Sequence, residues 1–290
     1  MKVLWIGYGK MGEPMCGRVV EAGHQVSVLD NGPAQRAAAM ARGLSLVGDT
    51  GGAAAEADAI VTSLPNDAAA RSVLAGAGSV LAQARAGSIL IETSTISVAA
   101  SRAIAEAAAA RGAVYARAPV SGTVGAASSG GLSSFVSGSA DALQKANPLI
   151  ACWAKKIIPV GSEEQARVMK LAVNLMVDTL MVSLSEAFAF CRKGGVDPAV
   201  AVDAITGSAI ASPHLAFKAQ SLLRADFVPT FTVTQTRKDL RLISEEARDL
   251  GVPILLGAAV EQIMAATEGM GFGGEDYIAC GKLIQRLSGL

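Results

Sequence analysis

One short stretch near the start of the chain, GYGKMGEPM at residues 7–15, limits the possible folds more than any other feature. The apolar run KVLWI precedes it with the length of a buried strand, and CGRVVEAG follows it with the composition of a helix. Gly7, Gly9 and Gly12 thus match G-x-G-x-x-G at a strand-to-helix turn, the context in which this pattern is informative. There the first glycine allows the tight bend, the second lets a pyrophosphate approach, and the third lets the helix pack closely.

A second strand pattern supports the same interpretation. QVSVLD ends at Asp30, close to the spacing of about 20 residues expected for the acid that accepts hydrogen bonds from an adenosine ribose. An acid there disfavours a 2′-phosphate, and the next arginine is Arg36. We therefore predict NAD as cofactor and NADP as the less favoured one. The alternative is a glycine-rich turn followed by an unrelated surface aspartate.

The first half of the chain alternates strand and helix patterns. Five further apolar runs have strand length, at residues 57–65, 87–95, 112–120, 133–139 and 155–161, and alanine-rich helical stretches separate the earlier ones. This alternation is typical of a parallel sheet covered by helices. We predict a Rossmann-type α/β dinucleotide-binding domain over residues 1–162.

The pattern changes after Gly161. SEEQ predicts a capping box in which Ser162 caps a helix and Gln165 reaches back. That helix should span about residues 163–192, and another should begin at Asp197 or Pro198. Helical periodicity continues to the end, so we predict an all-α domain over residues 163–290, joined to the first by the long helix.

Part of the long helix, Met169 to Cys191, is apolar enough to resemble a membrane span. It contains Lys170, Asn174, Asp178 and Glu186, which would be costly in lipid. We expect a helix buried between protein surfaces instead.

Composition excludes several classes of function. The 290 residues are 51% hydrophobic and 17% charged with a formal net charge of zero, so neither a nucleic-acid surface nor a membrane surface is indicated. The four cysteines are far apart and form no zinc-binding or disulfide pattern, so no metal is predicted. MKVLWIGYG has no signal-peptide pattern. We predict a cytoplasmic protein whose partners are small molecules and copies of itself.

Several motifs occur in a familiar order: GYGKMGEPM, SLP, ETSTIS, APVSGTVGA, KLAVN, Phe231, KDL and GEDY. In this order the whole chain resembles the β-hydroxyacid dehydrogenase family, which includes 3-hydroxyisobutyrate dehydrogenase, tartronate semialdehyde reductase and the glyoxylate/succinic semialdehyde reductases. The resemblance implies an oxidoreductase that transfers a hydride between NAD(P) and a short β-hydroxy acid or its semialdehyde. It also implies a homodimer or homotetramer.

The resemblance assigns site residues by position. The catalytic residues would be Lys170, as acid/base, and Asn174. The substrate-binding residues would be Ser121, Gly122, Thr123, Phe231 and Asp239. The cofactor-binding residues would be Gly7, Tyr8, Gly9, Lys10, Met11, Gly12, Asp30, Leu64, Pro65, Thr95 and Lys238.

The residues themselves favour a lysine as acid/base. His24 is predicted in a turn on the side away from the glycine motif, and His214 has no obvious carboxylate partner. Lys170 and Asn174 are spaced i, i+4 and share one helix face, although an ordinary polar stripe is the alternative. We hypothesise that desolvation lowers the pKa of Lys170 so that it can exchange a proton.

Two adjacent residues of the KDL motif should point in different directions. Neighbours on a helix lie about 100° apart, so we expect Lys238 to face the cofactor and Asp239 to face the helix that bears Lys170. A solvated helix face is the alternative. Asp276, in GEDY, is as consistent with a helix cap as with a substrate contact.

The sequence departs from the family pattern at four positions. Arg117 stands where the family usually has an acid, and Thr123 replaces a common second glycine. Glu164 and Ala166 stand in a turn that is normally glycine-rich. We expect these changes to keep the chemistry and to alter the substrate pocket.

Two alternative functions remain open. An imine reductase has a related architecture, but such enzymes usually lack the catalytic lysine, and Lys170 is present. A non-catalytic dinucleotide-binding module would be expected to lack Lys170 or Asn174, and both are present. The choice among β-hydroxy acids and the physiological direction are also open.

Overall fold

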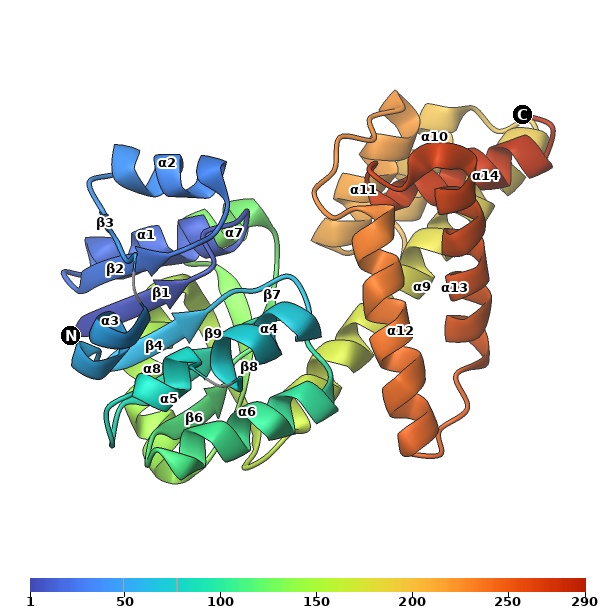
Figure 1. Cartoon of the computed structure of the whole chain (residues 1–290). Helices are drawn as coiled ribbons and strands as arrows, with labels where there is room; N and C mark the ends of the chain where they lie inside the picture. Colours follow the sequence, from blue (N-terminus) through green and yellow to red (C-terminus); the bar gives the residue numbers. More distant parts are fainter. Residues whose placement is uncertain (49, 77) are drawn as a thin grey trace. The chain divides into compact units, whose positions relative to one another are not determined.

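The structure is a computed structural model that describes residues 1–48, 50–76 and 78–290. The chain forms two compact units, Met1–Lys170 and Leu171–Leu290 (Figure 1). Helix α9 (Gln165–Lys193) runs through the division between them. The sequence predicts a boundary at residue 162, before this helix. The two compact units instead meet between Lys170 and Leu171, because the first turn of α9 packs into the N-terminal unit through the buried Arg167.

The N-terminal unit is built on one sheet. Its strands are β1 (Lys2–Ile6), β2 (Gln25–Leu29), β3 (Ser45–Leu46), β4 (Ala59–Thr62), β5 (Ile89–Glu92), β6 (Val114–Arg117), β7 (Val120–Ser121), β8 (Leu132–Ser137) and β9 (Ala154–Gly161). The order is β3-β2-β1-β4-β5-β6-β8-β7, with β9 paired to β8. The prediction of a Rossmann-type domain is confirmed, and β1 lies between β2 and β4 in the sheet.

The expectation of a parallel sheet holds from β3 to β6 and is wrong beyond it. Strand β8 is antiparallel to both β6 and β7, and β9 is parallel to β8. The link from β7 to β8 contains only the short helix α7 (Val124–Ser128), and a connection of that length cannot make a parallel crossover. The two-residue strands β3 and β7 were not predicted, because so short an extended segment has no periodicity.

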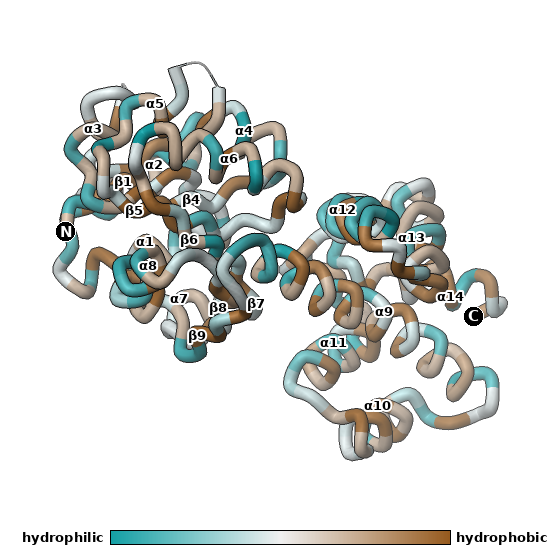
Figure 2. The backbone as a smooth tube through the Cα atoms, turned by 90° about the horizontal axis from the view of Figure 1, so that it is seen from below, coloured by the Kyte–Doolittle hydropathy of each residue, from teal (hydrophilic) through white to brown (hydrophobic). Residues whose placement is uncertain are grey.

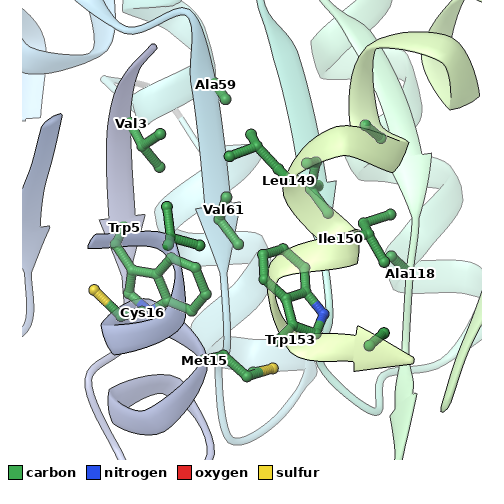
Figure 3. Close-up of a cluster of buried hydrophobic side chains, with 14 of the residues drawn as sticks. Val3, Trp5, Met15, Cys16, Ala59, Val61, Ala118, Leu149, Ile150 and Trp153 are labelled. Carbon is green, nitrogen blue, oxygen red and sulfur yellow. The ribbon is translucent and has the colours of Figure 1, made fainter. Parts of the chain in front are cut away.

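Helices cover both faces of this sheet (Figure 1). They are α1 (Gly12–Glu21), α2 (Pro33–Ala41), α3 (Thr50–Glu56), α4 (Asp67–Leu74), α5 (Val80–Gln83), α6 (Val98–Ala110) and α8 (Ala140–Trp153). Alternate residues of β1 enter two separate cores, Val3 and Trp5 in one and Leu4 and Ile6 in the other. In the first core Trp5 meets Trp153 of α8 edge to face, with ring centroids 5.7 Å apart (Figure 3).

The C-terminal unit is helical, as predicted. After α9 it contains α10 (Pro198–Thr206), α11 (Pro213–Arg224), α12 (Val233–Asp249), α13 (Leu255–Thr267), the π-helix η1 (Glu268–Phe272), the 3₁₀-helix η2 (Tyr277–Ala279) and α14 (Cys280–Leu287). Asp197 caps α10 by accepting from the backbone N–H of Ala199 at 2.9 Å, which confirms the expected start.

Helix α9 begins differently from the prediction. Its first residue is Gln165, and the Gln165 side chain accepts from the N–H of Glu163 at 2.8 Å. The hydroxyl of Ser137, at the end of β8, accepts from the N–H of Ala166 at 3.3 Å and donates to the Glu163 carbonyl. The expected cap by Ser162 is replaced by this tertiary contact, which a local pattern cannot reveal.

Helix α9 is also the one helix of the described residues that is long and apolar enough to cross a membrane, by length and composition alone. Figure 2 shows hydrophobic and hydrophilic segments alternating along it. Arg167 and Asp178 are buried within the protein, although Met176 and Phe190 are exposed. The helix therefore has one buried charged side chain in the part that belongs to each unit, Arg167 in the first and Asp178 in the second.

Candidate active site

The three glycines of the first turn occupy three different environments. Gly7 has φ +91°, and a Cβ there would lie 2.2 Å from the Ser63 carbonyl oxygen. A Cβ on Gly12 would lie 2.0 Å from the Gly7 carbonyl oxygen, so this position must be glycine for α1 to pack. A Cβ on Gly9 would meet no described atom within 4 Å. The turn therefore has open backbone at the one position where a pyrophosphate must approach, and it fits a dinucleotide.

Asp30 follows β2 directly and is held toward this turn. Its Oδ2 accepts from the N–H of Tyr8 at 2.6 Å, and its Oδ1 accepts from the N–H of Gly32 at 2.7 Å. The Tyr8 side chain itself is buried in the core, and burial raises the pKa of its hydroxyl. Arg36 donates to the Asp30 carbonyl oxygen at 3.4 Å, so a cation stands beside the acid.

The segments after β4 and β5 are joined by side-chain hydrogen bonds. The N–H of Leu64 donates to Ser94 Oγ at 2.7 Å, and the N–H of Ser94 donates to Glu92 Oε1 at 2.9 Å. Thr95 is half-buried, and Pro65 is exposed. The candidate cofactor residues of the N-terminal unit thus follow the carboxyl ends of β1, β2, β4 and β5, the edge at which open α/β sheets bind ligands. Lys10 is exposed there and Met11 is half-buried against the core.

The candidate substrate loop leads from β7 into α7. Gly122 has φ +140°, and a Cβ there would lie 2.6 Å from the Leu132 side chain. Thr123 is exposed and caps α7, since its hydroxyl accepts from the N–H of Ala126 at 3.2 Å. Because the Thr123 oxygen accepts this bond, the Thr123 hydroxyl hydrogen is directed away from the Ala126 N–H. Ser121, two residues earlier, is half-buried.

In the C-terminal unit, Asn174 and Asp239 meet. Asn174 Nδ2 donates to Asp239 Oδ2 at 2.7 Å, and Asp239 is buried. Asp239 therefore faces α9, the helix that bears Lys170, as expected. Lys238 Nζ lies 2.8 Å from Asp239 Oδ1, so the expectation that the two neighbours point apart is wrong in part. A long lysine side chain can fold back to its neighbour, which a helical-wheel argument ignores.

The remaining candidates have structural partners. Phe231 packs edge to face on Tyr277, with ring centroids 6.0 Å apart. Asp276 caps η2 through the N–H of Ile278 at 3.1 Å and pairs with the buried Lys218 at 2.6 Å. The cap considered for Asp276 therefore forms. Burial alone would raise its pKa, but the ion pair with Lys218 and the hydrogen bonds from Thr230 together lower the pKa below its usual value.

The two histidines have the environments of structural residues. His214 Nε2 lies 2.6 Å from the Tyr277 hydroxyl, and burial lowers the pKa of the imidazole. His24 lies 3.3 Å from the N-terminal amine, and burial lowers its pKa too. In each case the hydrogen-bond partner is a group other than a carboxylate.

Two buried ion pairs were missed by sequence reasoning. Arg117 pairs with Glu164, and Arg167 pairs with Glu92. Arg117 and Glu164 were expected to alter the pocket, but they neutralise each other in the interior. The sequence did contain a signal for these pairs, because charged residues lie within apolar segments and a buried charge needs a buried partner. The partners are too far apart in sequence to be matched by spacing.

Both halves of the chain match family models. Residues 2–161 match the NAD binding domain of 6-phosphogluconate dehydrogenase, and residues 165–284 match the model described as NAD-binding of NADP-dependent 3-hydroxyisobutyrate dehydrogenase. The chain is 31% identical to 2-(hydroxymethyl)glutarate dehydrogenase of Eubacterium barkeri over 291 residues, covering 100% of this chain and 97% of that protein.

Solved structures show the same relationship. The 3-hydroxyisobutyrate dehydrogenase of Mycobacterium tuberculosis, solved with L-serine, has a TM-score of 0.89 and 29% identity, covering 98% of this chain and 99% of that one. The imine reductase of Streptomyces aurantiacus has a TM-score of 0.64 and 20% identity, covering 98% and 99%. At that identity the second likeness shows the fold alone.

The relatives at 29% and 31% identity are dehydrogenases, and the two family models match residues in both units of this chain. The open backbone at Gly9 and the position of Asp30 beside this turn fit a dinucleotide. The chain therefore belongs to the β-hydroxyacid dehydrogenase family of NAD(P)-dependent oxidoreductases.

Proposed function

We propose that the protein transfers a hydride between NAD and a short β-hydroxy acid or the matching semialdehyde, with Lys170 as acid/base. The observation that carries the proposal is the arrangement on α9. Lys170 and Asn174 share one helix face, and a buried carboxylate, Asp239, holds Asn174. Helical spacing thus brings a titratable group and an oriented amide together, as a reacting hydroxyl requires.

Lys170 would move the proton. In the oxidation direction its neutral amine accepts the hydroxyl proton of the substrate, and in the reduction direction its ammonium donates a proton to the carbonyl oxygen. The bound nicotinamide accepts or supplies the hydride. A lysine suits this role when its pKa is lowered from about 10.4 toward the working pH, which requires desolvation at the site.

Asn174 would orient the reacting oxygen. A carboxylate only accepts hydrogen bonds, so the Asn174 amide nitrogen must face Asp239 and its Oδ1 must face away. That Oδ1 is then an acceptor for the substrate hydroxyl or for the Lys170 ammonium. An amide does not titrate at working pH, so this orientation is the same in both protonation states of Lys170.

The substrate carboxylate would be held by Ser121, Gly122 and Thr123. Hydroxyls and backbone N–H groups of a glycine-containing turn bind a carboxylate without a buried cation. Arg117 lies only a few residues earlier but is neutralised by Glu164, so its charge is already compensated. Phe231 and Asp239, which belong to the C-terminal unit, are the further proposed substrate-binding residues.

NAD is the proposed cofactor. The Asp30 carboxylate, fixed by two backbone N–H groups, suits the hydroxyls of an unphosphorylated ribose. Tyr8, Lys10, Met11, Leu64, Pro65, Thr95 and Lys238 are the further proposed contacts. Arg36, beside Asp30, is the residue from which any residual use of NADP would come.

Initial rates test the proposal. A panel of 3-hydroxyisobutyrate, tartronate semialdehyde, succinic semialdehyde, glyoxylate and 3-hydroxypropionate would be assayed with NAD(H) and with NADP(H), in the feasible directions. Activity on one member with a preference for NAD(H) is expected. Reduction of cyclic imines without activity on the panel would favour an imine reductase, and tight NADH binding without any turnover would favour a non-catalytic module.

A cytoplasmic location and a homodimer or homotetramer are part of the proposal. Support for self-association comes from large exposed apolar side chains of the C-terminal unit, among them Met176, Phe190, Leu255 and Leu256. Contact between such side chains and water is unfavourable, and a second copy of the chain would remove it.

A further inference from the structure

The start of helix α9 is tied to strand β6 by a buried ion pair. Arg117 is the last residue of β6, and Glu164 immediately precedes α9. Arg117 Nε donates to Glu164 Oε1 at 3.0 Å, and a second guanidinium nitrogen donates to the same oxygen. The side chains are only 10% and 8% exposed. The Arg117 guanidinium also lies 4.4 Å from the ring centre of Tyr115.

The same turn of α9 is tied to strand β5. Arg167, 1% exposed, forms an ion pair with Glu92, the last residue of β5. Its Nη1 donates to the Ser94 carbonyl at 2.8 Å, its Nη2 to the Tyr115 hydroxyl at 2.9 Å and its Nε to Ser101 Oγ at 3.3 Å. The guanidinium therefore has partners on β5, β6 and α6.

These contacts join the three segments that the proposed chemistry needs. Ser94 immediately precedes Thr95, and only Ala118 and Pro119 separate Arg117 from β7, the strand that leads to the substrate loop. Lys170 is one helical turn after Arg167 on α9. A shift of α9 along or around its axis would break both ion pairs, so they specify one position for the turn that carries Lys170.

Stability alone does not explain two such pairs. The cost of removing four charged groups from water often exceeds the attraction within the pairs, and apolar residues of similar size are often equally stable. The N–H groups of a guanidinium are fixed in one plane, so an arginine and a carboxylate can pair in only a few geometries. Such a pair therefore restricts the orientation of the segments that carry it.

We propose that Arg117, Glu164, Arg167 and Glu92 are positioning residues that set the rotation and height of α9 and thereby place Lys170. This inference rests on the proposed role of Lys170. It predicts that the pairs contribute to turnover and to the rigidity of the first turns of α9 more than to the stability of the unit.

A double variant separates these contributions. In Arg117→Met/Glu164→Met both charges are removed and neither partner is left buried alone, so the fold should persist with a Tm near that of the wild type. Arg85→Met is the matched control, since Arg85 forms an exposed ion pair with Asp58 in the same unit. Glu164→Asp, which keeps the charge at a shorter reach, is the second variant if the double variant does not fold.

The measurements are kcat, the pH profile of kcat, the Kd of NADH and hydrogen–deuterium exchange over residues 165–172. We expect kcat of the double variant to fall about 10- to 100-fold, as for a small misplacement of a catalytic group. The pH profile should shift, the NADH Kd should stay within about twofold, and exchange should accelerate. The kcat and the exchange rate of Glu164→Asp should lie between those of the wild type and those of the double variant. The inference would be overturned if the folded double variant had the kcat and the exchange rate of the wild type. If only Glu164→Asp folds, the same result in that variant would overturn it.

The exchange measurement does not need turnover. If the wild type acts on no hydroxy acid or semialdehyde, the proposed function fails, but faster exchange in the double variant would still show that the pairs fix α9. If the wild type is active and neither kcat nor exchange changes, the positioning role fails and the proposed function stands.

Discussion

At the level of single residues, backbone atoms crowd Gly7 and Gly12 of the first turn, whereas Gly9 has open space around it. The G-x-G-x-x-G pattern predicted one open and two crowded glycines, because backbone geometry around such a turn is nearly independent of the rest of the chain. The pair of Arg117 and Glu164 could not be predicted, because their contact depends on how β6 and α9 are placed by the fold. Each residue alone looked like a departure from a family pattern, and together they compensate.

The glycine turn gives a prediction with a built-in control. In Gly12→Ala the new methyl group collides with the Gly7 carbonyl, which should cost about 1–3 kcal/mol of unfolding free energy and lower Tm by roughly 5 °C. In Gly9→Ala the methyl group meets no described atom, so Tm should not change. The NADH Kd of Gly9→Ala should rise about tenfold, because the methyl group occupies the approach of the pyrophosphate. Thermal melts and fluorescence titration check both, and wild-type affinity in Gly9→Ala would contradict the assignment.

At the level of elements, the long runs were predictable and the short or tertiary features were not. The buried strands β1, β4 and β5 and the helices α9 and α10 follow from apolar length and periodicity. The start of α9 was missed because Ser137 of β8 supplies the cap. The direction of β8 was missed because strand direction depends on the connection before it.

The η2 turn gives a prediction about pH. Asp276 accepts from Thr230 N–H at 2.9 Å and pairs with the buried Lys218, so Asp276→Asn leaves that ammonium without its counter-charge and should cost about 3 kcal/mol at pH 7. The pKa of Asp276 is lowered in the folded state, so its contribution is complete above the unfolded pKa of about 3.9 and is lost as pH falls through the folded pKa.

Melts of wild type and Asp276→Asn should therefore differ at pH 7 and converge as the pH falls below about 4. Asp203→Asn, at an exposed position of α10, should match the wild type at both pH values. A difference between wild type and Asp276→Asn that is the same at pH 7 and pH 3 would show that the ion pair is not its cause.

At the level of the whole molecule, the fold class followed from the change of pattern after Gly161. Alternating strands and helices can bury their apolar faces only around a sheet, and continuous helical periodicity can bury its faces only against other helices. The substrate does not follow in the same way, since it is selected by a few pocket residues.

Self-association is a prediction at this scale. Light scattering should give a mass of at least twice the 29.4 kDa of one chain, because the exposed apolar side chains of α9 and α13 favour contact with a second copy. Phe190→Glu together with Leu255→Glu should shift the protein toward the single-chain mass. A wild-type mass of one chain across the working concentration range would contradict the proposal.

The pH profile of kcat/KM for hydroxy acid oxidation, in wild type and Lys170→Ala, tests the acid/base role most directly. Wild-type kcat/KM should rise with pH as Lys170 loses its proton, whereas Lys170→Ala should be about 10²- to 10⁴-fold slower and lack that ionisation. Lys156→Ala, at an exposed position of β9, should reproduce the wild-type profile. A Lys170→Ala profile equal to the wild type in rate and midpoint would contradict the account.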